Sequence, residues 1–67
     1  MNTLKINGND VNLVSPIMLA DLLLMKNYNP EKIAIELNGK IVPKKEYRNV
    51  TIGNLDSLEI VSFVGGG

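Results

Sequence analysis

The sequence predicts an α+β fold, with a mixed sheet of four to five strands and one helix packed on one face. Three observations support this prediction. Two runs of alternating apolar and polar residues flank an Asn-Gly pair near the N-terminus, a strongly apolar segment of helical length follows, and three further strand-like segments complete the chain. A length of 67 residues allows only one domain.

Residues 3–13 are predicted to form a β-hairpin. Leu4 and Ile6 alternate with a polar residue, and the same alternation resumes after the turn residues of segment 7–10. Asn-Gly between two alternating runs is a strong hairpin signal, because both residues tolerate positive φ. An irregular loop is the alternative interpretation of this segment.

The next segment predicts a helix. Ser15 is a favourable N-cap, and Pro16 at the first helical position forfeits no hydrogen bond. The helix is expected to end at Lys26 or Asn27, before the helix-breaking residues of segment 27–30.

The predicted helix carries more apolar residues than one buried face needs. With Asp21 on the solvent side, the core side lies near Leu19 and Leu23, flanked by Leu22 and Ala20. Either the helix is rotated so that its methionines pack at the core margin, or the surplus residues form a partner-facing patch. The surplus residues are Ile17, Met18, Leu24 and Met25.

Between the predicted helix and the last strand, the sequence predicts two strands and a short apolar step. Residues 32–37 alternate cleanly, with Ile33, Ile35 and Leu37 on one face, and end at a second Asn-Gly turn. A short apolar step at 41–42 is limited by Pro43 to an edge or an end of a sheet. A charged connection at 44–48, expected to form at most one helical turn, leads to a short strand at 50–52 and a turn at 53–56.

The last strand is apolar on both faces, which is typical of a central strand or of one that meets a partner. Leu58 and Ile60 are expected to face the helix. Val61, Phe63 and Val64 would then form an apolar partner-binding patch on the open face. The alternative for Val61 and Phe63 is that the connection around Tyr47 covers them.

The order strand, strand, helix, strand, strand, strand is that of the β-grasp, or ubiquitin-like, fold. A hairpin followed by a crossover helix and a parallel strand gives a mixed sheet with one open face. We expect residues 1–64 to form this domain and residues 65–67 to form a flexible C-terminal glycine tail.

The composition excludes many functions. The chain has no His and no Cys, which argues against zinc, iron–sulfur or other metal sites of that chemistry, disulfides, and Cys- or His-based catalysis. Seven basic residues balance seven acidic ones, so nucleic acid is not an expected partner. No membrane span or signal peptide is recognisable, and a cytoplasmic location is expected. We predict no catalytic residue, no metal site and no bound cofactor.

The glycine tail is the candidate for chemistry. Glycine is costly to order and adds no side-chain contact, so Gly65, Gly66 and Gly67 are not explained by stability. A thread without side chains can enter a narrow enzyme channel and deliver its terminal carboxylate. That carboxylate needs activation, for example as a mixed anhydride with AMP, before a sulfur or amine nucleophile can attack it.

The chain resembles the ThiS family, the sulfur carrier proteins of thiamine thiazole biosynthesis, over essentially its whole length. The resemblance is carried by segments 58–67 and 38–43, by Asp21-Leu22-Leu23 and by Tyr47. One departure is the turn before the last strand, where Leu55-Asp56 stands in place of the family's usual Gly-Asp.

The resemblance implies a function for the tail. Gly67 would be adenylated by an ATP-dependent, E1-like (ThiF-like) enzyme and converted to a thiocarboxylate with sulfur from a cysteine desulfurase persulfide. A thiazole synthase (ThiG-like) would then take the sulfur. ATP and magnesium would belong to the activating enzyme, so this chain would be a protein cosubstrate rather than an enzyme.

Other functions share the fold. A molybdopterin synthase small subunit or a tRNA-thiolation modifier also has a β-grasp domain and a Gly-Gly end, although the former tends to carry prolines shortly before its tail, whereas the last proline here is Pro43. A non-covalent β-grasp binding module is a different class. Such a module should tolerate residues added after Gly67, whereas a carrier should not.

Overall fold

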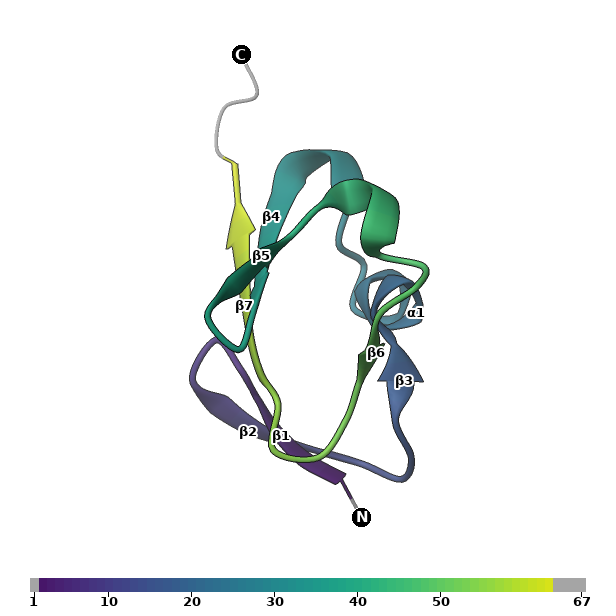
Figure 1. Ribbon diagram of the computed structural model, residues 1–67, viewed down its shortest axis with the longest axis vertical. Helices are drawn as coiled ribbons and strands as arrows, with labels where there is room; N and C mark the ends of the chain where they lie inside the picture. Colours follow the sequence, from purple (N-terminus) through teal and green to yellow (C-terminus); the bar gives the residue numbers. More distant parts are fainter. Residues whose placement is uncertain (1, 64–67) are drawn as a thin grey trace.

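The computed structural model describes residues 2–63, and shows a mixed five-stranded sheet with one α-helix on one face (Figure 1). The strand order is β2-β1-β7-β4-β5, with β7 parallel to β1 and antiparallel to β4. The expected fold class, a β-grasp fold, is confirmed. The elements of this layer are β1 (Asn2–Ile6), β2 (Asn9–Leu13), α1 (Leu19–Met25), β4 (Ile33–Leu37), β5 (Lys40–Val42) and β7 (Ser57–Ser62).

Both Asn-Gly pairs form the predicted hairpin turns. Asn7 and Gly8 have φ of 51° and 82°, and join β1 to β2 with Ile6 opposite Asn9. The pair at 38–39 joins β4 to β5 with φ of 52° and 86°. Such turns match the right-handed twist of the flanking strands, so these short sequence signals determine two of the four strand pairings in the sheet.

The predicted start of the helix is wrong. Ile17 and Met18 form a short strand, β3 (Ile17–Met18), which pairs antiparallel with β6 (Thr51–Ile52) in a separate two-stranded sheet. Helix α1 therefore begins at Leu19, and Ser15 does not cap it. A short strand pairing made by residues distant in sequence overrides the local Ser-Pro signal.

Backbone carbonyls of the second half of the chain accept hydrogen bonds from the first N–H groups of α1. The N–H of Leu19 donates to the carbonyl of Val50 at 2.8 Å, and the N–H of Ala20 donates to the carbonyl of Tyr47 at 2.9 Å. These two donors would otherwise be unpaired at a helix N-terminus. The connection between β5 and β6 thus performs the role that sequence reasoning assigned to a capping side chain.

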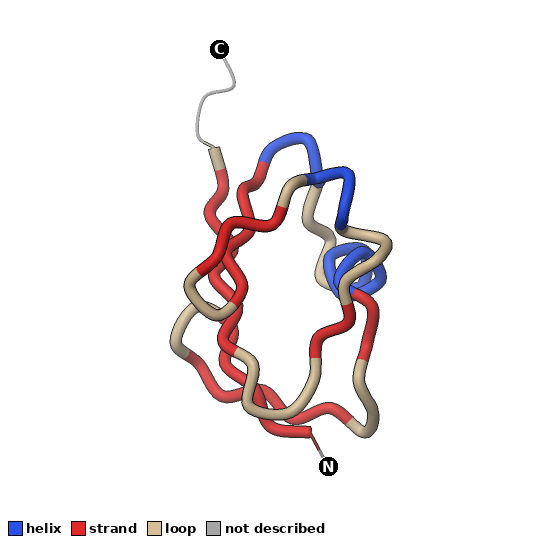
Figure 2. The backbone as a smooth tube through the Cα atoms, in the orientation of Figure 1, coloured by secondary structure: helices blue, strands red, loops and turns tan. Residues whose placement is uncertain are grey.

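Two short 3₁₀ turns flank the sheet (Figure 2), η1 (Pro30–Lys32) before β4 and η2 (Lys44–Glu46) after β5. The Asn29 side chain caps η1 by accepting the N–H of Glu31 at 3.0 Å. The expected single helical turn in the charged connection is confirmed as η2. Residues 2–63 contain no helix long and apolar enough to cross a membrane.

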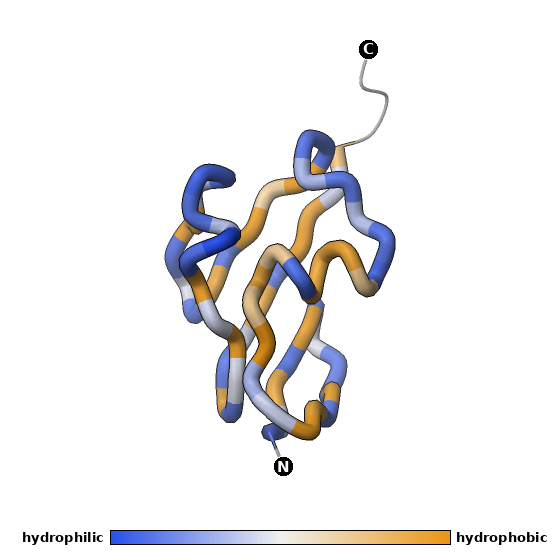
Figure 3. Tube along the Cα trace, turned by 90° about the vertical axis from the view of Figure 1, so that its right-hand side faces the viewer, coloured by the Kyte–Doolittle hydropathy of each residue, from blue (hydrophilic) through white to orange (hydrophobic). Residues whose placement is uncertain are grey.

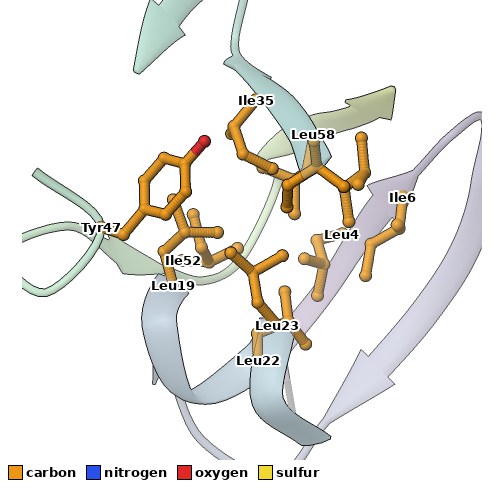
Figure 4. Close-up of a cluster of buried hydrophobic side chains, with 11 residues drawn as sticks. Leu4, Ile6, Leu19, Leu22, Leu23, Ile35, Tyr47, Ile52 and Leu58 are labelled. Carbon is orange, nitrogen blue, oxygen red and sulfur yellow. The ribbon is translucent and has the colours of Figure 1, made fainter. Parts of the chain in front are cut away.

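The core lies between α1 and the sheet, where side chains from both layers converge (Figure 4). Hydrophobic residues recur along much of the chain, and several of its loops are hydrophilic (Figure 3). The expected packing of the last strand against the helix is confirmed, with Leu37 partly buried at the margin. The buried core residues are Leu4, Ile6, Leu19, Leu22, Leu23, Ile33, Ile35, Tyr47, Ile52, Leu58 and Ile60.

Candidate functional site

The site expected from the sequence consists of the glycine tail and the apolar patch beside it. Val64, Gly65, Gly66 and Gly67 lie outside the described residues, so the predicted roles of these four stay predictions. The described part of the site is the strand that leads to them. β7 is the middle strand of the sheet, held by β1 on one side and β4 on the other.

The two faces of β7 differ sharply. Leu58 and Ile60 are buried under α1, with exposed fractions of 0% and 6%. Val61 and Phe63 point to the other face and are 58% and 55% exposed. The alternative that the connection around Tyr47 covers them is wrong, because both side chains stay more than half exposed.

Two residues missed by sequence reasoning extend the patch. Ala34 on β4 lies directly opposite Val61, and the alternation of segment 32–37 already placed Ala34 on the face away from the helix. Ile41 on β5 lies opposite Glu36 on that same face and is 70% exposed. We call these four apolar residues, Ala34, Ile41, Val61 and Phe63, the open-face patch.

Charged residues adjoin the open-face patch on the same side of the sheet. Glu36 on β4 and Glu59 on β7 are directly opposite each other, which places two carboxylates side by side. Farther along, Lys5 and Asp10 form an ion pair of 2.7 Å across the first hairpin. The two glutamates therefore place negative charge beside the patch, whereas the Lys5–Asp10 pair adds no net charge.

Phe63 also contributes to a shallow hollow of about 320 Å³ at the end of the sheet. Pro43, Lys44 and Tyr47 line the same hollow. Burial raises the pKa of the Tyr47 hydroxyl above its ordinary value, and the nearby Lys44 opposes this effect. Tyr47 therefore stays neutral at physiological pH and serves as a core residue with a polar tip.

A second hollow, of about 890 Å³, lies between α1 and the charged connection. Leu24 projects into it and is 76% exposed, while Met25 at the end of α1 is 58% exposed. The interpretation in which the methionines pack at the core margin is thus wrong for Met25. Ile17 and Met18 belong to β3, so only two of the four surplus residues lie on the helix.

Within residues 2–63, no group of three His, Cys, Asp or Glu side chains is arranged to hold a metal ion. The same part of the chain has no buried side-chain nitrogen or oxygen without a hydrogen-bond partner. The described part of the site is therefore an exposed apolar face on the strand that precedes the terminal glycines. These features define a β-grasp protein with one exposed apolar sheet face.

Comparison with known proteins gives the family. The model of the ThiS family matches residues 4–67. The sulfur carrier protein ThiS of Bacillus subtilis is 35% identical over 65 residues, covering 96% of this chain and 98% of that protein. An uncharacterized protein, ycf40, of Porphyra purpurea is 37% identical over 97% of this chain and 92% of its own length. The chain belongs to the ThiS family.

Two further similarities are to a solved structure and to a longer protein. The crystal structure of the thiamine biosynthesis protein ThiS from Geobacter metallireducens superimposes with a TM-score of 0.81 at 26% identity, covering 97% of this chain and 99% of that one. A thiazole synthase of Paramagnetospirillum magneticum is 41% identical over 64 residues, which are 96% of this chain but only 20% of that protein.

Proposed function

We propose that this chain is a sulfur carrier protein for thiazole formation in thiamine biosynthesis. In this proposal the main-chain carboxylate of Gly67 carries the sulfur, and the open-face patch binds the enzymes that act on it. Membership of the ThiS family is the observation that carries the proposal, since the family match extends through residue 67. The exposure of Val61 and Phe63 on the strand that leads to the glycines supports it.

The proposed chemistry takes place entirely at Gly67. An E1-like, ThiF-like enzyme transfers AMP from ATP to the carboxylate and releases pyrophosphate, with magnesium bound by that enzyme. The terminal sulfur of a persulfide, charged by a cysteine desulfurase, attacks the carbonyl and displaces AMP. A thiol then reduces the resulting acyl disulfide and leaves a thiocarboxylate. This chain would be a protein cosubstrate, acting in the cytoplasm, with no cofactor of its own.

The composition supports this assignment of roles. A sulfur carrier needs no cysteine when the sulfur is bound to a main-chain carbonyl, and this chain has none. The absence of cysteine and histidine side chains also leaves no thiol or imidazole in this chain to attack the activated carbonyl. The proposed pathway therefore needs no reactive side chain in the carrier.

A thiazole synthase (ThiG-like) is the proposed acceptor of the sulfur. The Paramagnetospirillum magneticum protein named thiazole synthase contains a region like this chain that makes up a fifth of its length. A second thiazole synthase, of Magnetococcus marinus, shows the same relation at 34% identity. A region of this kind within proteins of that name supports a direct contact between a carrier and a thiazole synthase.

Intact-mass measurement tests the proposal. The chain is incubated with ATP, magnesium, an adenylating enzyme shown to be active on its own carrier, and a persulfide donor. Replacement of one oxygen by sulfur adds about 16 Da. Absence of this gain on the native chain would overturn the proposal. A chain that lacks Gly66 and Gly67 is the matched control, and formation of a thiocarboxylate on it would contradict the role of Gly67.

A non-covalent binding module is the second candidate function, favoured by the open-face patch alone. The two functions differ in whether they tolerate residues added after Gly67. Two extra residues after Gly67 should abolish the mass gain in a carrier, because the glycine carboxylate is then part of a peptide bond. A module that binds through the open face should keep its affinity for its partner.

A further inference from the structure

The backbone of β7 alternates in the direction of its hydrogen bonds. The N–H of Phe63 donates to the carbonyl of Lys32 at 2.8 Å, and the carbonyl of Ser57 accepts the N–H of Asn38 at 2.8 Å. Both bonds lie on the β4 side. In an antiparallel pair, residues two apart repeat the same direction, so residues 57, 59, 61 and 63 bond toward β4. The backbone groups of residues 58, 60 and 62 therefore point to the opposite side.

On that opposite side, β1 covers only the first part of β7. The parallel register ends with Ile6 beside Leu58. Asn7 makes the last two contacts: its N–H donates to the carbonyl of Leu58 at 2.8 Å, and its side-chain oxygen accepts the N–H of Ile60 at 2.7 Å. The chain then turns at Gly8 and runs back as β2.

Three backbone groups of β7 are left beyond this point. They are the carbonyl of Ile60, the N–H of Ser62 and the carbonyl of Ser62, and no residue of the described segment 2–63 pairs with the N–H of Ser62. Ser62 is exposed. Figure 1 shows the end of β7 extending past the β1–β2 turn, with β4 on one side only. We call these three groups the β7 edge.

We propose that the β7 edge pairs with an extended strand of the enzyme that adenylates Gly67, so that the partner continues the sheet where β1 ends. This inference rests on the proposed function. Unpaired backbone groups in an extended strand are a template for an added strand, which supplies affinity that does not depend on side chains. Such pairing fixes the position and direction of the last strand relative to the enzyme, at a residue that is five positions before Gly67.

The same residues favour a partner enzyme over a second copy of this chain. Val61 and Phe63 belong to the open-face patch, and the β7 edge lies on Ser62 between them, so one partner can contact both at once. Three backbone groups alone are too few to hold a second copy, because stable interfaces bury about 1,200–2,000 Å², whereas the adenylating enzyme also has to bind the glycine tail in the proposed function. The β7 edge therefore adds to the interface made by the open-face patch and extends that interface toward the glycines.

A proline substitution tests the pairing. Ser62→Pro removes the N–H and fills its position with ring carbons, and a free edge position in a strand tolerates proline. Ser62→Ala is the matched control, since it changes the side chain and keeps the N–H. We expect both variants to stay folded, and we expect the adenylation rate, measured as pyrophosphate release at limiting carrier, to fall about tenfold or more for Ser62→Pro only. Equal rates for the two variants would overturn the inference.

Hydrogen exchange on the unaltered chain keeps the inference testable if Ser62→Pro fails to fold. The Ser62 amide should exchange rapidly in the free chain and slow about tenfold or more when the adenylating enzyme is bound. An unprotected Ser62 amide in that complex would contradict the inference, while the mass gain of the native chain would leave the proposed function intact. Protection that rises with the concentration of the chain alone would indicate a second copy instead. A native chain that is never adenylated would overturn both.

Discussion

The side-chain oxygen of Asn7 accepts the backbone N–H of Ile60 at 2.7 Å, although the two residues are 53 positions apart in sequence. Asn7 also has positive φ as the first residue of the hairpin turn. One residue thus shapes the local turn and connects it to the strand that leads to the glycine tail. This double role explains why asparagine suits a position where glycine would satisfy the turn alone.

Replacing Asn7 should therefore destabilise the fold through β7. Asn7→Gly keeps the turn conformation but leaves the Ile60 N–H without its acceptor, and we expect the free energy of unfolding to fall by about 1 kcal/mol. Asn7→Asp keeps a side-chain oxygen and should lose less. Urea unfolding of the three proteins measures the difference. Equal stability of Asn7→Gly and the native chain would show that the bond contributes nothing.

Leu55 should be a site where glycine stabilises the protein. Its φ is 69° and its side chain is 83% exposed, so it bears the strain of a left-handed conformation while burying little apolar surface. We expect Leu55→Gly to raise the free energy of unfolding by about 0.5–1 kcal/mol, less than the full strain because glycine is more flexible in the unfolded chain. Thermal and urea unfolding measure this.

Leu24→Gly is the matched control for that prediction. Leu24 is also exposed but lies in α1, where glycine should cost about 1 kcal/mol. Opposite signs for the two substitutions would support backbone conformation as the cause. If both substitutions destabilised the protein, the exposed Leu55 side chain would contribute to stability by more than its strained backbone costs.

The open-face patch should matter for activation more than for folding. Phe63→Asp puts a charge at a position that is 55% exposed, so we expect less than about 0.5 kcal/mol of lost stability. The rate of thiocarboxylate formation should fall about tenfold, because a docking face then has to bury a carboxylate. Intact-mass time courses and thermal unfolding separate the two effects.

Leu24→Asp provides the control on the helix side of the molecule, where an exposed leucine lines the other hollow. It should leave the rate close to native. If Leu24→Asp and Phe63→Asp lowered the rate equally, the open-face patch would not be the specific docking surface. Unfolding of Phe63→Asp without a separate rate defect would show that Phe63 is a core residue.

Tyr47 should make stability sensitive to alkaline pH. Burial raises the pKa of its hydroxyl in the folded state, so the unfolded chain loses this proton at lower pH than the folded chain does. The associated stability is fully present below the unfolded pKa and is lost as pH rises through the folded value. We expect the native chain to lose more stability than Tyr47→Phe between pH 8 and pH values above about 10. Urea unfolding at these pH values measures the loss in each protein. An equal loss of stability in the native chain and in Tyr47→Phe would contradict this prediction.

Local sequence signals predicted most of the sheet. The two Asn-Gly turns, the alternation of 32–37 and the apolar last strand each correspond to an observed element, because strand period and turn φ depend on neighbouring residues. The start of the helix was predicted wrongly, since the pairing of Ile17 with Ile52 depends on residues far apart in the chain. Ile41 was missed as part of the open-face patch for the same reason.

The sequence by itself predicted the fold class, the family resemblance and the candidate residue Gly67, and it left the last strand as either central or partner-facing. Periodicity and turn chemistry, which are local properties, predict the fold class, whereas the family and the role of Gly67 come from the resemblance of several segments to the ThiS family. Only the tertiary structure decided which side chains share the open face, what satisfies the start of α1 and where β1 leaves β7. These depend on strand register and on where a neighbouring strand ends, because a hydrogen bond or an exposed edge is defined by two segments that only folding brings together.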